Sequence, residues 1–363
     1  MSVSPPGEAH AGGTSPVEVP VGMGQRIIQI HPLLTCNLRC THCYSNSSPA
    51  ATGSLDLVAL CEVLTDAAAL GYTTVAISGG EPLLYRGLDR LLEHAKALGM
   101  RTSLTTNGTL LQPGRLAALR GSLDLMAISL DGPPALHNEM RASDTAFERL
   151  QGGIEHVRDA GIPFGILHTI TRRSWEHLVW VADFAATHGA ALLQLHPLEL
   201  TGRAELLMRG AEPDEDILTR AYLLSLALAD QYLGTLTVQF DAFRRDLLRE
   251  RPELVYATDG PPGISQAPAA ELLGLLVVEA DGTIVPISYG VSHRYRICQL
   301  PHERLGAAWP RYAEHGYRAF RELCRAVHVE ATLPSVLPFF DWHAMIVARS
   351  HTAPTLAYER ARG

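Results

Sequence analysis

Three cysteines with metal-binding spacing stand near the beginning of the chain: Cys36, Cys40 and Cys43. Tetrahedral zinc takes four protein ligands in a structural site, so zinc would need a fourth ligand from elsewhere in the chain. The remaining cysteines are Cys61, Cys298 and Cys324. A 4Fe-4S cluster fits the loop better, because three cysteines can hold three of its irons. The sequence therefore favours a cluster whose remaining iron is open to a substrate or cofactor.

The cysteine loop follows a short apolar stretch, and this arrangement recurs along the chain. The apolar stretches are 26–32, 73–78, 101–106, 124–129, 163–169 and 191–197, and longer amphipathic segments follow most of them. Alternating strands and helices predict an α/β fold with a parallel sheet, as a barrel or a doubly wound sheet. In both architectures ligands bind beyond the carboxyl ends of the strands. Chemistry is therefore expected directly after each strand.

Two of the amphipathic segments carry clear helix signals. Residues 54–71 have apolar side chains at three- and four-residue spacing, with Ser54 as the predicted N-cap and Gly71 as the stop. Residues 85–99 end in the same way at Gly99. Both segments are expected to pack on the outside of the sheet.

The order of the motifs behind the strands resembles that of the radical S-adenosylmethionine (radical SAM) enzymes. Cys36-x3-Cys40-x2-Cys43 is followed by Ser-Gly-Gly-Glu-Pro at 78–82, Thr-Thr-Asn-Gly at 105–108 and Ser-Leu-Asp-Gly-Pro at 129–133. The resemblance implies a partial (β/α)6 barrel over residues 25–235. It also implies one 4Fe-4S cluster on the three cysteines and S-adenosylmethionine (SAM) on the open iron. Reductive cleavage of SAM would then give a 5′-deoxyadenosyl radical.

The same resemblance assigns SAM contacts to the strand ends. The backbone of Gly79 and Gly80 would approach the methionine part, beside Ser78, and Glu81 would accept from its ammonium group. Polar groups for the SAM carboxylate or ribose would come from Asn107, Ser129 and Asp131.

Two histidines are further candidates for cofactor contacts. His42 stands where the family places an aromatic ring against adenine, although a histidine beside a metal ligand can also be merely exposed. On the sixth strand, Gln194 and His196 are two residues apart and so face the same side. His196 would approach adenine or substrate if that side is the lumen, and it would otherwise be a structural histidine.

The region behind the barrel resembles the SPASM group of radical SAM enzymes, many of which modify ribosomally made peptides. The run 129–141 and the stretch 272–290, read as a β-hairpin turning at Asp281-Gly282, carry this resemblance. Where that group has a cysteine, this chain has Ile287, and only Cys298 and Cys324 follow the barrel. Residues 236–363 are therefore predicted to form a SPASM-like α+β extension without an auxiliary cluster.

Without a second cluster, outcomes that return hydrogen or expel a leaving group are favoured: epimerisation, rearrangement or dehydration. An epimerase needs a hydrogen donor, and Cys298 is the first candidate and Cys324 the second, unless both are small buried apolar residues. The favoured substrate is a ribosomally made peptide; a sugar, nucleoside or aminocyclitol is the alternative. A catalytically silent homologue that only binds the cluster is a further alternative.

Partners and location follow from charge and composition. The chain has 363 residues and a net charge of −8, without a long basic run, so a nucleic-acid partner is not expected. Without an apolar membrane span or signal peptide, a cytoplasmic protein is predicted, with a flexible N-terminal arm over 1–24. Expected partners are an electron donor such as flavodoxin or ferredoxin and, for a peptide substrate, a separate leader-peptide-binding protein. Residues predicted to line the pocket mouth, or else solvated surface, are Arg172, Arg173, Glu199, Arg203, Asp241, Tyr289, His293 and Tyr295.

Overall fold

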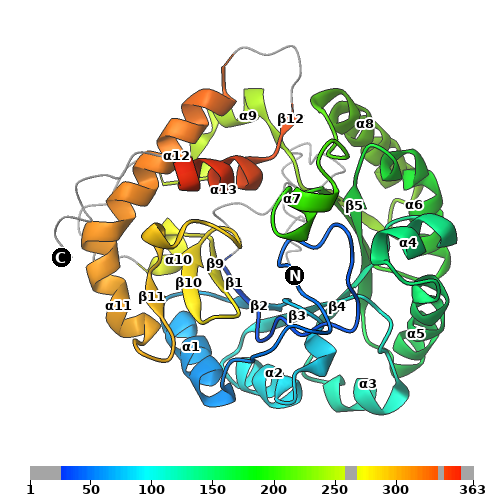
Figure 1. Cartoon of the computed structure of the whole chain (residues 1–363), viewed down its shortest axis with the longest axis horizontal. Helices are drawn as coiled ribbons and strands as arrows, with labels where there is room; N and C mark the ends of the chain where they lie inside the picture. Colours follow the sequence, from blue (N-terminus) through cyan, green and yellow to red (C-terminus); the bar gives the residue numbers. More distant parts are fainter. Residues whose placement is uncertain (1–25, 258–267, 334–338, 353–363) are drawn as a thin grey trace, which may run out of the picture.

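The structure, a computed structural model, describes residues 26–257, 268–333 and 339–352. The predicted N-terminal arm, residues 1–24, lies outside the described residues. Within the described part, one large sheet carries the fold, with the strand order β11-β10-β9-β1-β2-β3-β4-β5-β6-β7. The strands curve around the inside of the molecule and the helices lie outside them (Figure 1).

Strands β1 to β7 are parallel, and each pairs with the next one along the chain. Their bounds are β1 Ile27–Ile30, β2 Thr74–Ile77, β3 Arg101–Thr106, β4 Leu125–Ser129, β5 Phe164–Ile170, β6 Leu192–Pro197 and β7 Thr237–Phe240. Because β11 and β7 are the two ends of the sheet, the barrel is incomplete. The predicted α/β fold with a partial parallel barrel is confirmed, and β7 adds a seventh parallel strand to the six predicted.

Helices connect these strands and cover the outer face of the sheet (Figure 1). Their bounds are α1 Leu57–Ala69, α2 Leu88–Ala97, α3 Pro113–Leu119, α4 Pro134–Arg141, α5 Ala146–Ala160, α6 Leu178–Thr187, α7 Arg203–Leu207 and α8 Glu215–Gln231. Helix α7 differs from the others, because it lies over the carboxyl end of the strands rather than on the rim.

Apolar and polar side chains alternate along the strands, which explains why one face of the sheet packs against helices and the other faces the lumen. On β1, Ile28 and Ile30 are completely buried, whereas Gln29 between them is half-buried. On β6, Leu193 and Leu195 are completely buried, and His196 points to the opposite side with Gln194. The aliphatic side chains form the core under the helices, so the polar ones are left for the lumen.

The C-terminal part of the chain extends the same sheet. Strand β9 (Leu275–Val278) pairs in parallel with β1, and β10 (Thr283–Pro286) returns antiparallel to β9. The hairpin predicted at Asp281-Gly282 is confirmed: Gly282 has φ +89° and the Asp281 carboxylate accepts from the Thr283 N–H at 2.8 Å. Strand β11 (Cys298–Gln299) adds the outer edge.

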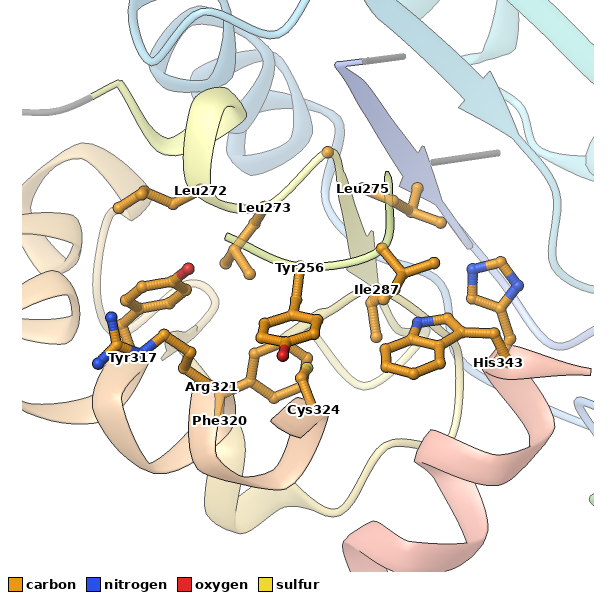
Figure 2. A pocket seen from close by; sticks show the side chains of 13 residues that line it. Tyr256, Leu272, Leu273, Leu275, Ile287, Tyr317, Phe320, Arg321, Cys324 and His343 are labelled. Carbon is orange, nitrogen blue, oxygen red and sulfur yellow. The ribbon is translucent and has the colours of Figure 1, made fainter. Parts of the chain in front are cut away.

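The C-terminal part also contains the following shorter strands and helices. They are β8 Phe243–Arg244, α9 Arg245–Glu250, α10 Ala269–Leu272, α11 Leu305–Arg311, α12 Tyr317–Ala331, β12 Phe339–Phe340 and α13 Trp342–Thr352. Strands β8 and β12 form a separate two-stranded sheet. Ile287, at the position where a cysteine was expected, and Cys324 both line a cavity between the hairpin, α12 and α13 (Figure 2).

One predicted helix boundary is wrong. Helix α1 begins at Leu57, and its N-cap is Asp56, not Ser54. The Asp56 carboxylate accepts from the N–H groups of Val58 and Ala59 at 2.9 and 3.1 Å. Ser54 instead forms a β-bridge with Leu33 in the cysteine loop. The predicted stop at Gly71 is confirmed, since this residue has φ +92° just after the helix.

In the part of the chain that the structure describes, no helix is long and apolar enough to cross a membrane.

Candidate functional site

The cysteine loop lies directly beyond the carboxyl end of β1, where the sequence predicted chemistry. Cys36 and Cys40 are buried, and Cys43 is partly exposed. Backbone N–H groups point at two of the sulfurs: Leu38 donates to Cys36 Sγ at 3.5 Å and Ser47 to Cys43 Sγ at 3.3 Å. Burial raises the pKa of Cys36 to about 12, so a bound metal must displace the proton.

The arrangement of the three sulfurs bears on the choice between zinc and a cluster. Bonds of about 2.3 Å to one tetrahedral zinc would place the sulfurs about 3.8 Å apart. Among the described residues, Cys36, Cys40 and Cys43 do not form a group whose ligand atoms all lie within 4.8 Å of one another. The three sulfurs are thus not gathered around one point as they stand, and three thiolates on one loop match a 4Fe-4S cluster whose remaining iron is open.

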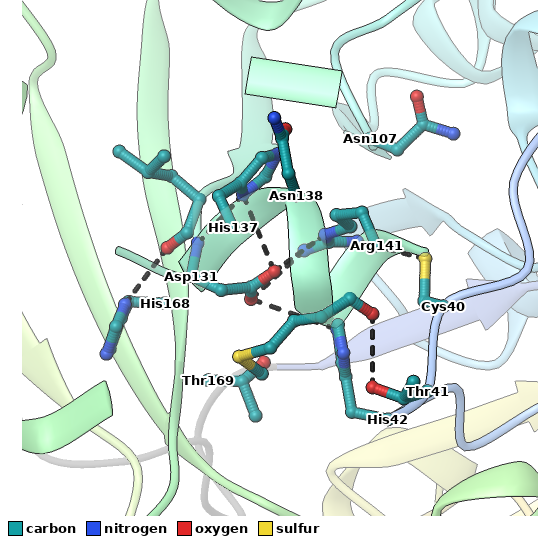
Figure 3. Close-up of polar contacts among 12 residues, drawn as sticks. Cys40, Thr41, His42, Asn107, Asp131, His137, Asn138, Arg141, His168 and Thr169 are labelled. Carbon is teal, nitrogen blue, oxygen red and sulfur yellow. Dashed lines mark hydrogen bonds and ion pairs between the residues drawn. The ribbon is translucent and has the colours of Figure 1, made fainter. Parts of the chain in front are cut away.

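A buried ion pair brings positive charge to the cysteine loop (Figure 3). Arg141, at the end of α4, donates to both carboxylate oxygens of Asp131 at 2.7 and 3.2 Å, and its third nitrogen lies 3.7 Å from Cys40 Sγ. Burial alone would raise the pKa of Asp131, but the Arg141 guanidinium outweighs it and holds that pKa well below its ordinary value. Both Asp131 oxygens are therefore engaged by Arg141. The predicted contact of Asp131 with SAM stays a prediction.

Two histidines lie close to this ion pair, and both are uncharged. His42 Nε2 lies 3.8 Å from one Asp131 oxygen and His137 Nδ1 lies 3.6 Å from the other. Burial lowers the pKa of each of these histidines to about 4 despite the nearby carboxylate. Both rings are thus neutral at pH 7. The His42 ring is largely buried and belongs to the cysteine loop itself, and its contact with adenine stays a prediction.

A second arginine also contacts the cysteine loop. Arg203, the first residue of α7, donates to the carbonyl oxygens of Cys40 and Ser47 at 2.8 and 2.5 Å. Its own N–H donates to the Cys43 carbonyl at 2.9 Å. Helix α7 therefore acts as a clamp on the loop. The sequence indicated Arg203 only as a residue of the pocket mouth.

The glycines behind β2 are required by the cysteine loop itself. A Cβ on Gly80 would lie 2.2 Å from the Thr35 carbonyl oxygen, and one on Gly79 would lie 2.7 Å from the Leu33 oxygen. Gly79 also has φ +109°. The Gly80 N–H donates to Leu33 at 2.9 Å. The backbone of the cysteine loop thus occupies the space beside both glycines. The approach of SAM to these glycines stays a prediction.

Glu81 joins the ends of β2 and β3. One carboxylate oxygen accepts from the Thr106 hydroxyl at 2.8 Å and the Leu83 N–H at 3.1 Å, and the other accepts from the Asn107 N–H at 2.9 Å. Burial raises the pKa of Glu81 although these donors oppose it. A carboxylate has about four lone-pair sites, so these three donors leave one site unused on a side chain that is completely buried. The predicted contact of Glu81 with the SAM ammonium group stays a prediction.

Two more predicted residues lie at neighbouring strand ends. Asn107 donates to Asn37 at 3.0 Å, and the same amide nitrogen lies 3.8 Å from Cys36 Sγ. Ser129 ends β4 and is largely buried. Asn107 therefore belongs to the surroundings of the cysteine loop, which the sequence did not predict. The roles of both residues toward SAM stay predictions.

An aromatic stack that the sequence did not predict lies beside the loop. His31, the residue after β1, is completely buried and stacks on Tyr289 with ring centroids 4.7 Å apart. Tyr44 meets both rings edge-on, and its hydroxyl lies 3.1 Å from the Ser78 hydroxyl. Tyr289 comes from the C-terminal part, so that part contributes directly to the lumen.

A charged network lies at the carboxyl ends of β6 and β7. His196 is held between Asp241 at 3.3 Å and Glu199 at 3.2 Å, and Gln194 donates to Asp241 at 2.6 Å. Burial opposes the charged imidazole, but the two carboxylates raise the pKa of His196 well above its ordinary value. Both ring nitrogens then donate to carboxylates. His196 is therefore already engaged at the barrel mouth, and its contact with adenine or substrate stays a prediction.

The strand register places Cys298 away from the lumen. Cys298 pairs with Ile284, Ile284 with Val278, and Val278 with Ile30, so the four side chains share one face of the sheet. Ile30 is buried under the helices, and Cys298 lies three strands away, about 14 Å. Cys298 therefore does not fit the predicted role of hydrogen donor. Cys324 lies on α12 and lines the cavity of Figure 2.

Of the residues expected near the pocket mouth, some lie at the site and others lie elsewhere. Glu199, Arg203, Asp241 and Tyr289 lie at the site described above. Exposed ion pairs account for Arg172 with Asp214 and Arg173 with Glu139. His293 pairs with Glu279, whose side chain is buried. Tyr295 is buried against Phe320.

An incomplete parallel barrel with an open three-cysteine loop at its carboxyl end defines a class of metal-cluster enzyme. Residues 30–185 match the Radical SAM superfamily. This part of the chain is a radical SAM domain, and enzymes of that family use a 4Fe-4S cluster and SAM.

Known proteins of this class resemble the chain over much of its length. It is 29% identical to an AdoMet-dependent heme synthase of Methanosarcina barkeri, over 70% of this chain and 74% of the relative. It is also 29% identical to a PqqA peptide cyclase of Ruegeria pomeroyi, over 76% and 71%. The structure of anSMEcpe with bound AdoMet and Cp18Cys peptide superposes with a TM-score of 0.61 at 18% identity, over 92% of this chain and 97% of that chain.

Proposed function

We propose that Cys36, Cys40 and Cys43 hold one 4Fe-4S cluster, and that the chain binds SAM at the open iron to abstract hydrogen from a ribosomally made peptide. The observation that carries the proposal is the cysteine loop. Its three thiols lie on one short loop, and backbone N–H groups, Asn107 and Arg141 surround them. When bound, the cluster and SAM supply an electron and a 5′-deoxyadenosyl radical.

The residues of the chain prepare this chemistry by position and charge. Arg141 places a fixed positive charge beside Cys40, which stabilises a negatively charged group on the loop. Arg203 clamps the loop backbone, so that the sulfurs keep their positions. Helix α7 lies against the loop, and the rings of His31 and Tyr289 meet Tyr44, the residue after Cys43. These contacts limit access of water to this end of the loop.

The peptide substrate is supported by two of the related proteins. The name of the R. pomeroyi relative states a peptide substrate, and the anSMEcpe structure contains a bound peptide. The same identity of 29% to a heme synthase favours a small molecule as the second candidate substrate. The electron donor, a flavodoxin or ferredoxin, and a separate leader-peptide-binding protein belong to the proposal as partners.

The test is reductive cleavage of SAM. The protein, reconstituted without oxygen, should hold about four irons per chain. It should form 5′-deoxyadenosine from SAM after reduction with dithionite. Cys40→Ala should lose both iron and product. Cys61→Ala is the matched control, because Cys61 lies on α1 outside the loop, and it should keep both.

Three outcomes count against parts of the proposal. About eight irons would mean a second cluster. Intact iron without 5′-deoxyadenosine, with peptides and small molecules present, would favour a catalytically silent protein. Stimulation of cleavage by a small molecule but not by peptides would favour the second substrate class.

A further inference from the structure

Helix α7 lies at the barrel mouth and is anchored by its first two residues (Figure 1). It spans only Arg203–Leu207, and of these residues Arg203 and Ala204 are buried. The three residues that follow are exposed: Leu206 is 81% exposed and Leu207 is 60% exposed. A helix of this length is not stable on its own in water. The position of α7 therefore depends on the contacts of its first turn.

Among the described residues, Arg203 donates hydrogen bonds only to the cysteine loop. Its guanidinium donates to the carbonyl oxygens of Cys40 and Ser47 at 2.8 and 2.5 Å, and its backbone N–H donates to the Cys43 carbonyl at 2.9 Å. The two segments also approach closely, because a Cβ on Gly202 would lie 2.2 Å from the backbone oxygen of the residue after Cys43. The first turn of α7 and the backbone of the loop thus form one packed unit.

The positive charge of Arg203 is not balanced by a carboxylate. Arg203 is only 6% exposed, and in the described part of the chain its guanidinium forms no ion pair. Arg141, the other buried arginine beside the loop, is instead paired with Asp131. Carbonyl oxygens are neutral acceptors, so they satisfy the donors of Arg203 without balancing its charge. Because an uncompensated buried charge is costly, Arg203 indicates that a negatively charged group belongs on the loop.

We propose that Arg203 couples the cluster to helix α7: the negative charge of a cluster on the loop balances Arg203, and α7 is then held more firmly over the barrel mouth. The proposal rests on the proposed function, because a cluster held by three thiolates supplies this negative charge. Arg203 is a positioning residue here, since it acts on the cluster through the carbonyl groups of the loop.

Such a coupling acts in both directions. If the cluster strengthens the contacts of α7 with the loop, those contacts strengthen the binding of the cluster by the same factor. The cluster should therefore slow the opening of α7, and loss of the Arg203 charge should speed the loss of iron. Both effects can be measured without the SAM reaction.

Amide hydrogen exchange of α7 tests the coupling in the wild-type protein. The full chain is compared before and after anaerobic reconstitution of the cluster, by mass spectrometry of a peptide that covers residues 200–208. Exchange of this peptide should be about tenfold slower in the reconstituted protein, because opening of α7 would then separate opposite charges. Helix α6 on the outer face of the sheet is the internal control, and its exchange should stay the same.

Arg203→Gln separates the charge from the hydrogen bonds. Glutamine keeps an amide donor but carries no charge, so the cluster should no longer slow the exchange of α7. Release of iron to the chelator bathophenanthroline should be about tenfold faster than from the wild-type protein. Arg209→Gln is the matched control, because Arg209 lies just after α7 in an exposed pair with Glu205. It should leave both measurements unchanged.

The possible failures are distinct. Equal exchange of α7 in the cluster-free and reconstituted wild-type protein would overturn the coupling, and this comparison does not depend on how a variant folds. A slowing of α7 exchange that persists in Arg203→Gln would show that the charge of Arg203 is not its cause. A wild-type protein that retains no iron would overturn the proposed function itself, and the coupling with it.

Discussion

Arg141 shows how a single side chain serves both folding and the site. Its guanidinium fork is bidentate to Asp131, which is completely buried, and it also reaches Cys40. A buried pair of this kind stabilises the fold little compared with apolar residues, but removal of one partner leaves the other charge uncompensated. The pair is therefore best explained by the positive charge that it fixes beside the cysteine loop.

Replacement of Arg141 should reveal this uncompensated charge. Arg141→Met should lower the free energy of unfolding by about 3–5 kcal/mol, measured by urea denaturation at pH 7. Arg173→Met is the matched control, because Arg173 makes the same fork to Glu139 with both side chains exposed. It should cost at most about 1 kcal/mol. Equal losses in the two variants would show that the buried pair has no special role.

His31 should make the stability of the protein depend on pH. Burial lowers the pKa of His31 from 6.5 to about 3. Between these two pH values the imidazole is therefore protonated in the unfolded chain and neutral in the folded chain. This contribution to stability is complete above pH 6.5 and is lost as the pH falls toward 3. Between pH 7 and 5 the loss should be about 2 kcal/mol. His31→Phe keeps a stacking ring and should lack this part of the loss in urea denaturation; parallel pH profiles would contradict it.

Some residues of the site could be predicted from a local sequence pattern, and others could not because they contact distant parts of the chain. Cys36, Cys40 and Cys43 could be predicted, because their spacing lies within one loop. The actions of Arg141 and Arg203 on this loop could not, because their partners lie 101 and 163 residues away. The sequence could not choose between the two interpretations of Cys298, a hydrogen donor or a small buried residue, because the face on which it lies depends on pairing across four strands.

At the scale of elements, local signals fixed most boundaries of the barrel. Gly71 ends its helix as expected, since a left-handed residue is needed there and glycine supplies it without strain. The start of α1 was misplaced by two residues, because Asp56 and Ser54 are both good N-caps. The C-terminus of helix α4 differs from this pattern. There the left-handed residue is Ala142, with φ +50°, and not a glycine.

The end of α4 is therefore a place where the sequence can be improved. Ala142→Gly should raise the free energy of unfolding by about 1 kcal/mol, because the left-handed backbone costs a Cβ-bearing residue about that much. Ala142 is exposed, so loss of its methyl group removes little packing. Gly161 ends α5 with φ +66°, and a Cβ there would meet no atom within 4 Å. The reverse change, Gly161→Ala, should cost about 1 kcal/mol; thermal denaturation of both variants measures the opposite signs, and shifts of the same sign would refute the explanation.

At the scale of the whole molecule, the sheet crosses the predicted division of the chain. The sequence divides the chain into a barrel over 25–235 and an extension over 236–363. In the structure, β7 begins at Thr237 and pairs with β6, and β9 pairs with β1 over four residues. The parallel pairing of strands so distant in sequence leaves no local signal, so the sequence could indicate the hairpin but not where it docks. The extension contributes Asp241 and Tyr289 to the site.

This continuity predicts that the barrel does not fold when it is separated at the division. A chain of residues 1–235 would expose the edge of β1, whose Ile27–Ile30 segment is apolar, and would also uncover β6. It should aggregate or lack a cooperative thermal transition in circular dichroism and size-exclusion chromatography. A chain of residues 1–352 keeps every described strand and should behave like the full protein. A soluble, cooperatively melting 1–235 chain that still binds iron would instead establish the predicted division as a true domain boundary.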